Sequence, residues 1–292
     1  MYRWKMASRS SVFMDPHVFT YSYEDQFDIS HSATPEAPAE YPIHIHDRYE
    51  IYYFLSGDVT YFIEGQGYSL NKHDLLVINT GELHRPIFNS SGRYERITVH
   101  FRPEYISSFQ QKDYNLLYCF ERRKLGHHNR IDGSDIIDNH IDRYFENIKK
   151  YAMECLRESD LMIKTYFLQM LVSLNRIFAE KKTAPENTMA YDEKIVGILD
   201  YINNHLHEQI TLDLLEEKFY VSKYYLCHLF RKNTGVTVGE YIAYKRILKA
   251  KELLIRGTPV LETCHAVGFR DYSNFYKTFR RLEGVSPREY KQ

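Results

Sequence analysis

The chain has 292 residues, and its 43% hydrophobic and 26% charged content is typical of soluble globular proteins, which excludes a largely disordered chain. This length exceeds the roughly 100–200 residues of a usual domain and predicts two or three units. Four scattered cysteines without a Cys-x-x-Cys pair argue against a disulfide framework or a structural zinc site. No stretch approaches the ~20 apolar residues of a membrane span, and no signal-peptide pattern is present, so we expect a cytoplasmic protein that does not enter a membrane.

The net charge of −1 conceals two halves of opposite sign. From Lys218 to Lys291 the chain carries 15 basic and 6 acidic residues, a balance of +9, so the remainder carries −10. A compact basic segment joined to an acidic one is typical of proteins that bind nucleic acid, although basic runs also occur on ordinary solvated surfaces.

Short predicted strands fill the region from about Tyr41 to Phe101. They are Tyr49–Ser56, Val59–Glu64, Asp74–Asn79 and Glu95–Phe101, separated by Gly, Asn and Ser. Many short strands with tight turns indicate a β-barrel or sandwich. The chain is thus expected to be a multidomain α+β protein whose first domain, residues 1–110, is a β-barrel.

The stretch "HIHDRYE" (His44–Glu50), which leads into the first of these strands, has the spacing of a metal site. His44 and His46 share one face of an extended chain. Glu50 lies about 13 Å further along a straight strand, so it joins them only if Asp47 and Arg48 turn the chain. The residues by themselves suit either a metal site, as in an enzyme, or another kind of site with the same spacing.

Two amphipathic helices are predicted next, over Asp135–Cys155 and Asp160–Lys181. They either pack on each other and on the barrel or contribute to a dimer interface, and the two possibilities are compatible. Pro185 and small polar residues interrupt the pattern, and we interpret Lys181–Thr188 as a linker. Residues 111–190 are therefore expected to form a helical dimerisation region and linker.

The last hundred residues repeat with a period of 49. "LCHLFRKNTGVTVGEY" (Leu226–Tyr241) aligns with "FYKTFRRLEGVSPREY" (Phe275–Tyr290), with six identities that include Phe230 with Phe279, Arg231 with Arg280 and Gly235 with Gly284. An internal repeat indicates one supersecondary unit used twice.

Each repeat predicts a helix-turn-helix unit. Thr211 and Ser222 suit the N-caps of the two helices in the first unit, and Gly268 suits the positive φ of the turn in the second. The residues expected on the exposed front of the two second helices are Lys223, Tyr224, Cys227, His228 and Arg231 in one and Tyr272, Ser273, Tyr276, Lys277 and Arg280 in the other. Hydrogen-bonding, cationic and aromatic side chains in this position suit contact with base edges and phosphates of double-stranded DNA.

The pair of units resembles the DNA-binding domain of the AraC family of bacterial transcription regulators. The resemblance covers about Tyr191–Lys291, so residues 191–292 are expected to form a double helix-turn-helix domain. Four positions depart from the family pattern: Glu216, where a small residue is usual, Tyr220, where glycine is usual, and Thr263 and Cys264, where isoleucine and alanine are usual. The first unit is affected more by these departures, so we expect the second unit to contribute more to base reading.

The family resemblance implies a small-molecule sensor at the N-terminus, often cupin-like. His44-x-His46-x3-Glu50-x6-Gly57 fits the first cupin motif, and "HDLLVINTGELH" (His73–His84) resembles the second with His73 and Asn79 as departures. The implied ligand set is His44, His46, Glu50 and His84, which suits Zn, Fe, Ni or Mn, direct effector contact without a metal, or barrel structure alone. No other cofactor is expected.

Tyrosines and phenylalanines gather in the same strands. They are Tyr49, Tyr52, Tyr53, Phe54, Tyr61, Phe62 and Tyr68. Such flat surfaces with hydroxyls suit a carbohydrate, with Tyr52 as an expected effector contact, although strand alternation places about half of them in a core or interface.

These features predict a sequence-specific DNA-binding regulator, not an enzyme, that responds to a small-molecule effector such as a sugar. The family resemblance implies a homodimer and, for activators, contact with RNA polymerase. The alternatives are a metal-dependent cupin enzyme, such as a dioxygenase or sugar isomerase, fused to a DNA-binding domain, and an architectural DNA binder with a vestigial barrel.

Overall fold

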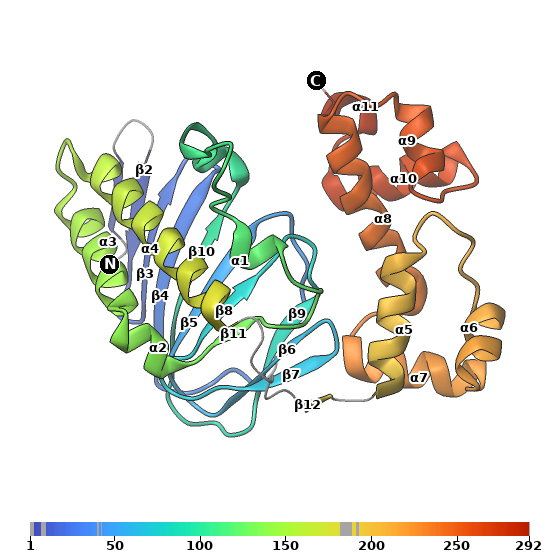
Figure 1. Cartoon of the computed structure of the whole chain (residues 1–292), viewed down its shortest axis with the longest axis horizontal. Helices are drawn as coiled ribbons and strands as arrows, with labels where there is room; N and C mark the ends of the chain where they lie inside the picture. The colour runs from blue at the N-terminus through green and yellow to red at the C-terminus, as the bar shows by residue number, and fades with distance from the viewer. Residues whose placement is uncertain are drawn as a thin grey trace. The chain divides into compact units, whose positions relative to one another are not determined.

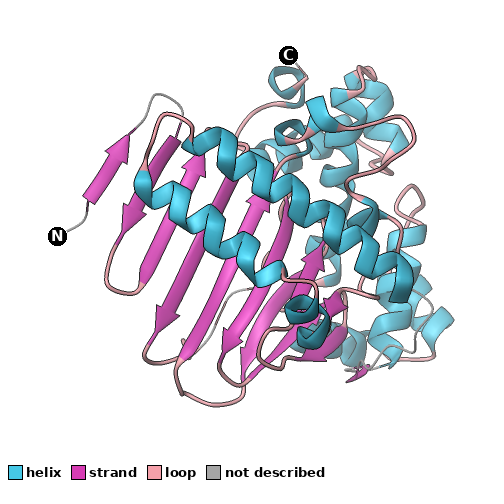
Figure 2. Ribbon diagram, turned by 60° about the vertical axis from the view of Figure 1, so that its left-hand side comes forward, coloured by secondary structure: helices cyan, strands magenta, loops and turns pink. Residues whose placement is uncertain are grey.

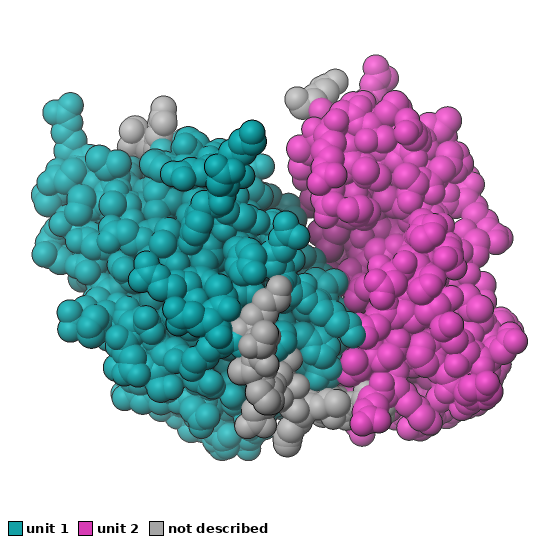
Figure 3. Space-filling model, in the orientation of Figure 1, with its two compact units in different colours: residues 1–41, 46–189 teal, residues 42–45, 190–292 magenta. Residues whose placement is uncertain are grey.

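The structure is a computed structural model that describes residues 3–6, 10–39, 41, 43–181, 189–190 and 193–291 (Figure 1). Except for Lys181, the predicted linker at 181–188 lies outside the described residues. The chain divides into two compact units, residues 1–41 with 46–189 and residues 190–292 with 42–45 (Figure 3). The helices of the region 111–190 thus belong to the same unit as the strands that precede them.

Two antiparallel sheets form the framework of the first unit. The larger sheet has the order β1-β2-β3-β4-β10-β5-β8-β11, with β1 at Arg3–Met6, β2 at Ser10–Met14, β3 at Val18–Tyr23, β4 at Phe27–Thr34, β5 at Tyr49–Ser56, β8 at Leu75–Ile78, β10 at Tyr94–Phe101 and β11 at Arg130–Ile131. The smaller sheet has the order β12-β7-β6-β9, with β6 at Val59–Ile63, β7 at Gln66–Ser69, β9 at His84–Phe88 and β12 at Met189–Ala190.

The predicted α+β architecture, with a β domain followed by an all-α domain of two helix-turn-helix units, is confirmed, but the barrel is not closed. Among the described residues, no strand of one sheet pairs with a strand of the other. The four predicted strands correspond to β5, β6, β8 and β10. The strands β1 to β4 were not predicted, although Phe19 and Tyr21 in β3 and Phe27 and Ile29 in β4 are buried at alternate positions, which is the pattern of a strand with one buried face.

Strand β5 is buried on both faces, because each face packs against a different layer. Ile51 and Tyr53 belong to the core under the helices, whereas Tyr52 and Phe54 belong to the core that also contains residues of the smaller sheet. Figure 2 shows the two long helices lying across the larger sheet. All seven aromatic residues considered as a carbohydrate surface are buried: Tyr49, Tyr52, Tyr53, Phe54, Tyr61, Phe62 and Tyr68. Six of them belong to the two cores: Tyr49 and Tyr53 to the core under the helices, and Tyr52, Phe54, Tyr61 and Tyr68 to the other.

The helices of the first unit pack on each other and on the larger sheet. They are η1 (Pro103–Tyr105), η2 (Ser107–Phe109), α1 (Tyr118–Glu121), α2 (Gly133–Asp138), α3 (Ile141–Glu154) and α4 (Ser159–Lys181). The helix predicted over Asp135–Cys155 is divided, because His140 adopts a left-handed conformation with φ of 56° between α2 and α3. Ile137 in α2 is 38% exposed, and Leu161 in α4 is 65% exposed.

The second unit consists of helices. They are α5 (Glu193–Asn204), α6 (Leu212–Phe219), α7 (Lys223–Thr234), α8 (Val238–Ile255), α9 (Val260–Ala266), α10 (Tyr272–Glu283) and α11 (Pro287–Tyr290). The predicted N-caps Thr211 and Ser222 both accept a backbone hydrogen bond, and Gly268 has the predicted positive φ, at 90°.

The sequence repeat corresponds to a repeat of local structure. Gly235 and Gly284 end α7 and α10 in the left-handed conformation, with φ of 76° and 77°. Each is followed by a capping box, Thr237 with Glu240 and Ser286 with Glu289, in which the two residues exchange side-chain and backbone hydrogen bonds. The repeated glycines and glutamates therefore serve the same turn in both units.

Candidate functional site

The first unit contains a buried carboxylate surrounded by histidines. Oxygen Oε2 of Glu50 lies 3.1 Å from Nε2 of His46, 3.0 Å from Nε2 of His84 and 3.3 Å from Nε2 of His100. The predicted set is His44, His46, Glu50 and His84. One ligand atom from each of these residues lies within 4.8 Å of the others. The residues that the cupin motifs single out are thus close together in space.

Sheet geometry explains how these side chains meet. The chain bends at Asp47 and Arg48, as the inclusion of Glu50 requires, and His84 is the first residue of β9. His100 lies on β10 directly opposite Glu50 on β5, in the register of the larger sheet. Sequence analysis missed His100, because only the strand register, which a single sequence does not reveal, makes it a cross-strand neighbour of Glu50.

Each of the three histidines also has an acceptor at its other ring nitrogen. Nδ1 of His46 lies 3.0 Å from the carbonyl oxygen of Arg48, and Nδ1 of His84 lies 2.7 Å from that of Glu82. Nδ1 of His100 lies 3.0 Å from Oδ1 of Asp28. These contacts fix the orientation of all three rings, so that each Nε2 points at Glu50.

The charges in the cluster stabilise one another. Burial acts to raise the pKa of Glu50, but the charge of His100 and the hydrogen bonds of His100, His46 and His84 outweigh it and hold that pKa well below its usual range. Burial acts to lower the pKa of His100, but Glu50 and Asp28 outweigh it and raise that pKa to about 10. The carboxylate and the imidazolium of His100 thus form a charged pair.

The cluster is partly exposed at His46 and His100, which we call its open side. The side chains of Glu50 and His84 are 3% and 0% exposed, whereas those of His46 and His100 are 23% and 26% exposed. Charged side chains lie around this open side, where Arg48 pairs with Asp28 at 2.7 Å and Arg102 pairs with Asp47 at 2.8 Å. A polar ligand could therefore approach along His46 and His100.

Tyr52, expected to contact an effector, does not belong to this open side. It is 1% exposed, and its hydroxyl oxygen lies 2.7 Å from that of Tyr94. Its ring packs on Tyr61, with centroids 4.6 Å apart. Because both the ring and the hydroxyl contact other residues inside the core between the sheets, Tyr52 is not available to an effector at the open side.

A buried ion pair between Arg123 and Glu82 helps to hold the ring of His84. The guanidinium of Arg123 donates two hydrogen bonds to the carboxylate of Glu82, at 2.7 and 2.6 Å, and both side chains are fully buried. Burial acts to raise the pKa of Glu82, but the charge and hydrogen bonds of Arg123 and the backbone N–H groups of Gly126 and Asn79 lower it. Since the carbonyl of Glu82 accepts from His84, this pair helps to position the histidine.

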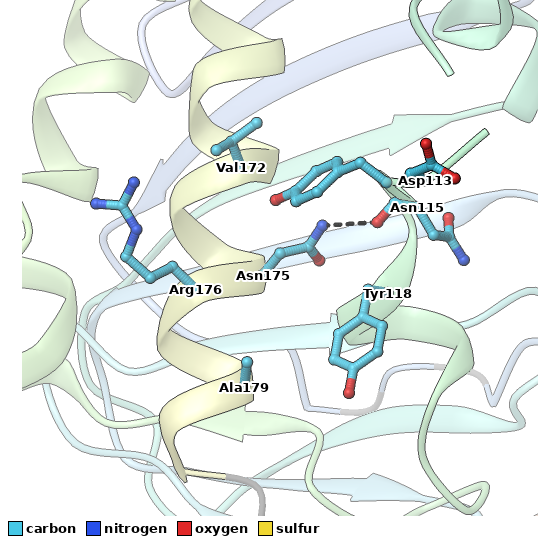
Figure 4. A pocket seen from close by; sticks show the side chains of 8 residues that line it. Asp113, Asn115, Tyr118, Val172, Asn175, Arg176 and Ala179 are labelled. Atoms are coloured by element: carbon cyan, nitrogen blue, oxygen red, sulfur yellow. Dashed lines mark hydrogen bonds between the residues drawn. The ribbon is translucent and has the colours of Figure 1, made fainter. Parts of the chain in front are cut away.

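A pocket of about 420 Å³ lies elsewhere on the first unit, between α4 and the segment before α1 (Figure 4). It is lined by Asp113, Tyr114, Asn115, Tyr118, Val172, Asn175, Arg176 and Ala179. Asn175 closes its floor by donating to the carbonyl of Asn115 at 3.0 Å and accepting from the N–H of Cys119 at 2.9 Å. None of the histidines of the Glu50 cluster lines this pocket.

In the second unit, α7 and α10 place their predicted front residues on the surface. Tyr224 is 86% exposed, and Cys227, His228 and Arg231 are also exposed, while Leu226 and Phe230 are buried on the opposite face. Lys223 is half-buried because its ammonium pairs with Asp213 and Glu216 of α6.

The front of α10 has the same organisation. Ser273, Lys277 and Arg280 are exposed, Tyr272 is 41% exposed and Tyr276 is half-buried. Phe275 and Phe279 are fully buried against α8 and α9. Asp271 caps the helix by accepting from the N–H groups of Ser273 and Asn274. Arg231 and Arg280, which the repeat aligns, are exposed in the last turn of both helices.

Two of the four departures from the AraC family pattern affect the turn of the first helix-turn-helix unit, between α6 and α7. Tyr220 adopts φ of 52° at the end of α6 and is 92% exposed, so a bulky residue occupies a position that favours glycine. Glu216 accepts a hydrogen bond at 3.0 Å from the N–H of Lys223 at the start of α7. Its carboxylate therefore stabilises the turn. The other two departures, Thr263 and Cys264, are buried in α9 of the second helix-turn-helix unit.

Comparison with known proteins agrees with this architecture. The family model of the AraC-like ligand binding domain matches residues 31–171, and that of a helix-turn-helix domain matches residues 215–292. Regulatory protein SoxS of Salmonella typhimurium is 30% identical over 104 residues, which are 35% of this chain and 97% of SoxS. The chain belongs to the AraC family. It is a DNA-binding transcription regulator with a ligand-binding domain.

Other known proteins match over different lengths. The lactose operon transcription activator of Staphylococcus xylosus is 24% identical over 240 residues, 80% of each chain. The solved C-terminal domain of the response regulator yesN from Fusobacterium nucleatum is 31% identical, covers 35% of this chain and 100% of that domain, and has a TM-score of 0.34.

Proposed function

We propose that this AraC-family regulator reads DNA through the fronts of α7 and α10 and that a small-molecule effector at the Glu50 cluster controls the binding. The observation that carries the proposal is the second unit, in which two capped helices each bury an apolar back and expose a polar, cationic and aromatic front. This is the arrangement by which a recognition helix enters the major groove.

The front residues suit two kinds of DNA contact. Tyr276 and Lys277 of α10 and His228 of α7 lie at the middle of the fronts and are proposed to contact base edges. The remaining front residues, with Arg231 and Arg280 at the helix ends, suit phosphate contacts that hold the register. In the first helix-turn-helix unit, Lys223 pairs with Asp213 and Glu216 and is therefore less available to contact DNA. This pairing favours α10 over α7 for base reading.

The helix α8, which joins the two recognition helices, sets their separation. Its 18 residues correspond to roughly 27 Å of helix. With the width of the flanking units added, the two fronts can reach successive major grooves, about 34 Å apart on one face of the duplex. One chain could thus contact two grooves.

The open side of the Glu50 cluster is the proposed effector site. His46, His100 and the charged groups around them offer several hydrogen-bond donors and acceptors within a small area. Such a surface suits a hydroxyl-rich ligand, and we propose a carbohydrate, in keeping with the name of the lactose operon activator among the relatives. Sensing is proposed instead of catalysis, since the DNA-binding unit supplies an output that an enzyme would not need.

A homodimer and a cytoplasmic location complete the proposal. Met153, Leu156 and Leu161, at the turn between α3 and α4, are 46%, 50% and 65% exposed. Apolar side chains gathered at one surface suit contact with a second copy of the chain. Contact with RNA polymerase is proposed from family membership alone. No helix in the described part of the chain is long and apolar enough to span a bilayer.

Selection of binding sequences from a random DNA pool tests the proposal. We expect the full chain to enrich a defined motif, and a thermal-shift screen of sugars to identify a ligand that changes affinity for that motif. Recovery of unenriched DNA would contradict base reading. Turnover of a sugar or oxygenase substrate by the purified protein would instead support the enzyme alternative.

A further inference from the structure

We propose that the Glu50 cluster holds a divalent first-row transition metal ion, bound by Oε2 of Glu50 and Nε2 of His46, His84 and His100. The inference deepens the proposed function, because this cluster is also the proposed effector site. The metal would occupy the closed end of the cluster. The effector would then meet it from the side on which His46 and His100 are exposed.

The separation of the donor atoms fits a common metal centre. Nitrogen and oxygen ligands lie about 2.0–2.2 Å from such ions, and two ligands on one ion at tetrahedral or right angles are then roughly 2.8–3.6 Å apart. The three distances from Oε2 of Glu50 to the Nε2 atoms of His46, His84 and His100 are 3.1, 3.0 and 3.3 Å. All three fall in this interval without any movement of the backbone.

The orientation of the three rings favours the same conclusion. The partners of the three Nδ1 atoms are two backbone carbonyls and the carboxylate of Asp28, all of which accept hydrogen bonds. With Nδ1 held by an acceptor, each ring keeps its Nε2 directed at Oε2 of Glu50.

Three ring nitrogens and one carboxylate oxygen thus converge on a single point in a buried part of the unit. A single divalent ion satisfies the three nitrogens and the oxygen together. Histidines that donate through one nitrogen to a carbonyl or carboxylate and present the other are also the usual arrangement at protein metal sites.

The donor set restricts the kind of ion. Three imidazole nitrogens with one carboxylate suit Zn²⁺, Fe²⁺, Ni²⁺, Co²⁺ or Mn²⁺, whereas Mg²⁺ and Ca²⁺ prefer oxygen ligands. Asp28 is assigned as a positioning residue, since it orients His100 and also pairs with Arg48 at 2.7 Å.

Metal titration of the full chain tests the inference. Protein dialysed against a chelator is titrated with Zn²⁺ by calorimetry, and with Co²⁺ by visible absorption, which reports nitrogen ligation directly. We expect one ion per chain and a d–d absorption band typical of mixed nitrogen and oxygen ligands. Binding of less than about 0.2 equivalents, or a Co²⁺ spectrum of an all-oxygen site, would overturn the inference.

Variants locate the ion. Glu50→Gln and His84→Ala should weaken Zn²⁺ binding by more than about 100-fold, and Asp28→Asn by about 10–100-fold. His46→Ala, at a position 23% exposed, replaces them if either fails to fold by circular dichroism. His31→Ala is the matched control, because His31 pairs with Glu95 at 2.9 Å on the same sheet. Equal losses in the control and the cluster variants would overturn the assignment.

The same preparations separate this inference from the proposed function. Each is also assayed for binding to the selected DNA motif. Absent metal binding with intact DNA binding overturns the metal site alone, whereas metal binding without DNA recognition overturns the proposed function alone.

Discussion

The buried ion pair between Arg123 and Glu82 gives a sharp test of the first unit. Replacement of Arg123 by methionine removes two hydrogen bonds, of 2.7 and 2.6 Å, and leaves the carboxylate of Glu82 fully buried without its cation. Removal of one partner from a buried pair usually destabilises a protein by about 3–5 kcal/mol. We expect Arg123→Met to fall in this range.

The size of the effect makes it easy to measure. For a unit of this length, 1 kcal/mol corresponds to about 2–4 °C in melting temperature, so the first unit should melt roughly 6–20 °C lower. Differential scanning calorimetry of the full chain is the suitable assay, because two units can unfold in separate transitions. Only the transition of the first unit should move.

A matched control identifies the cause. Arg176→Met changes the same residue type at an exposed position of α4 and should alter stability by less than about 0.5 kcal/mol. The double variant Glu82→Gln with Arg123→Met should lose less than the sum of the single variants, because it removes the unpaired charge. A loss in Arg123→Met no larger than that in Arg176→Met would refute the reasoning.

Three further changes test the second unit. Tyr220→Gly should stabilise it by about 0.5–1 kcal/mol in urea unfolding, since it relieves a left-handed residue that is 92% exposed, and a loss of stability would contradict that cause. Gly268→Ala should cost more than ~1 kcal/mol in the same assay, because the added Cβ would lie 2.3 Å from the carbonyl oxygen of Leu206 at φ of 90°, and an unchanged midpoint would be incompatible with this packing. Arg280→Ala should weaken binding to all DNA and lower the slope of log affinity against log salt by about one, whereas an unchanged slope would exclude a phosphate contact.

The sequence was most informative where function and local structure use the same residues. The period of 49 predicted two helix-turn-helix units because the capping residues of the turns, Gly235 with Glu240 and Gly284 with Glu289, recur at fixed spacing. The cupin motifs likewise predicted that His46, Glu50 and His84 lie close together. Their separation depends only on the bend at Asp47 and Arg48 and on the position of His84 at the start of β9.

What the sequence could not supply was strand register and burial by distant elements. His100 joins the cluster only because β10 pairs with β5 in one particular register. Tyr52 does not reach the open side, because it packs on Tyr61 and its hydroxyl contacts that of Tyr94. The helix is divided at His140, which adopts a left-handed conformation although it is not a glycine, so the break has no signal in the sequence. Each of these results from contacts between residues far apart in the chain.

The front of α10 provides the most direct test of DNA recognition by this regulator. Fluorescence anisotropy would compare the affinity of the full chain for its selected motif and for a scrambled duplex. In Lys277→Ala and Tyr276→Ala we expect the affinity for the motif to fall by about 1–3 kcal/mol while that for scrambled DNA changes little. Lys249→Ala, which removes an exposed lysine of α8 paired with Glu252, should leave the difference between the two duplexes unchanged. Equal losses on both duplexes in the α10 variants would contradict base reading by this helix.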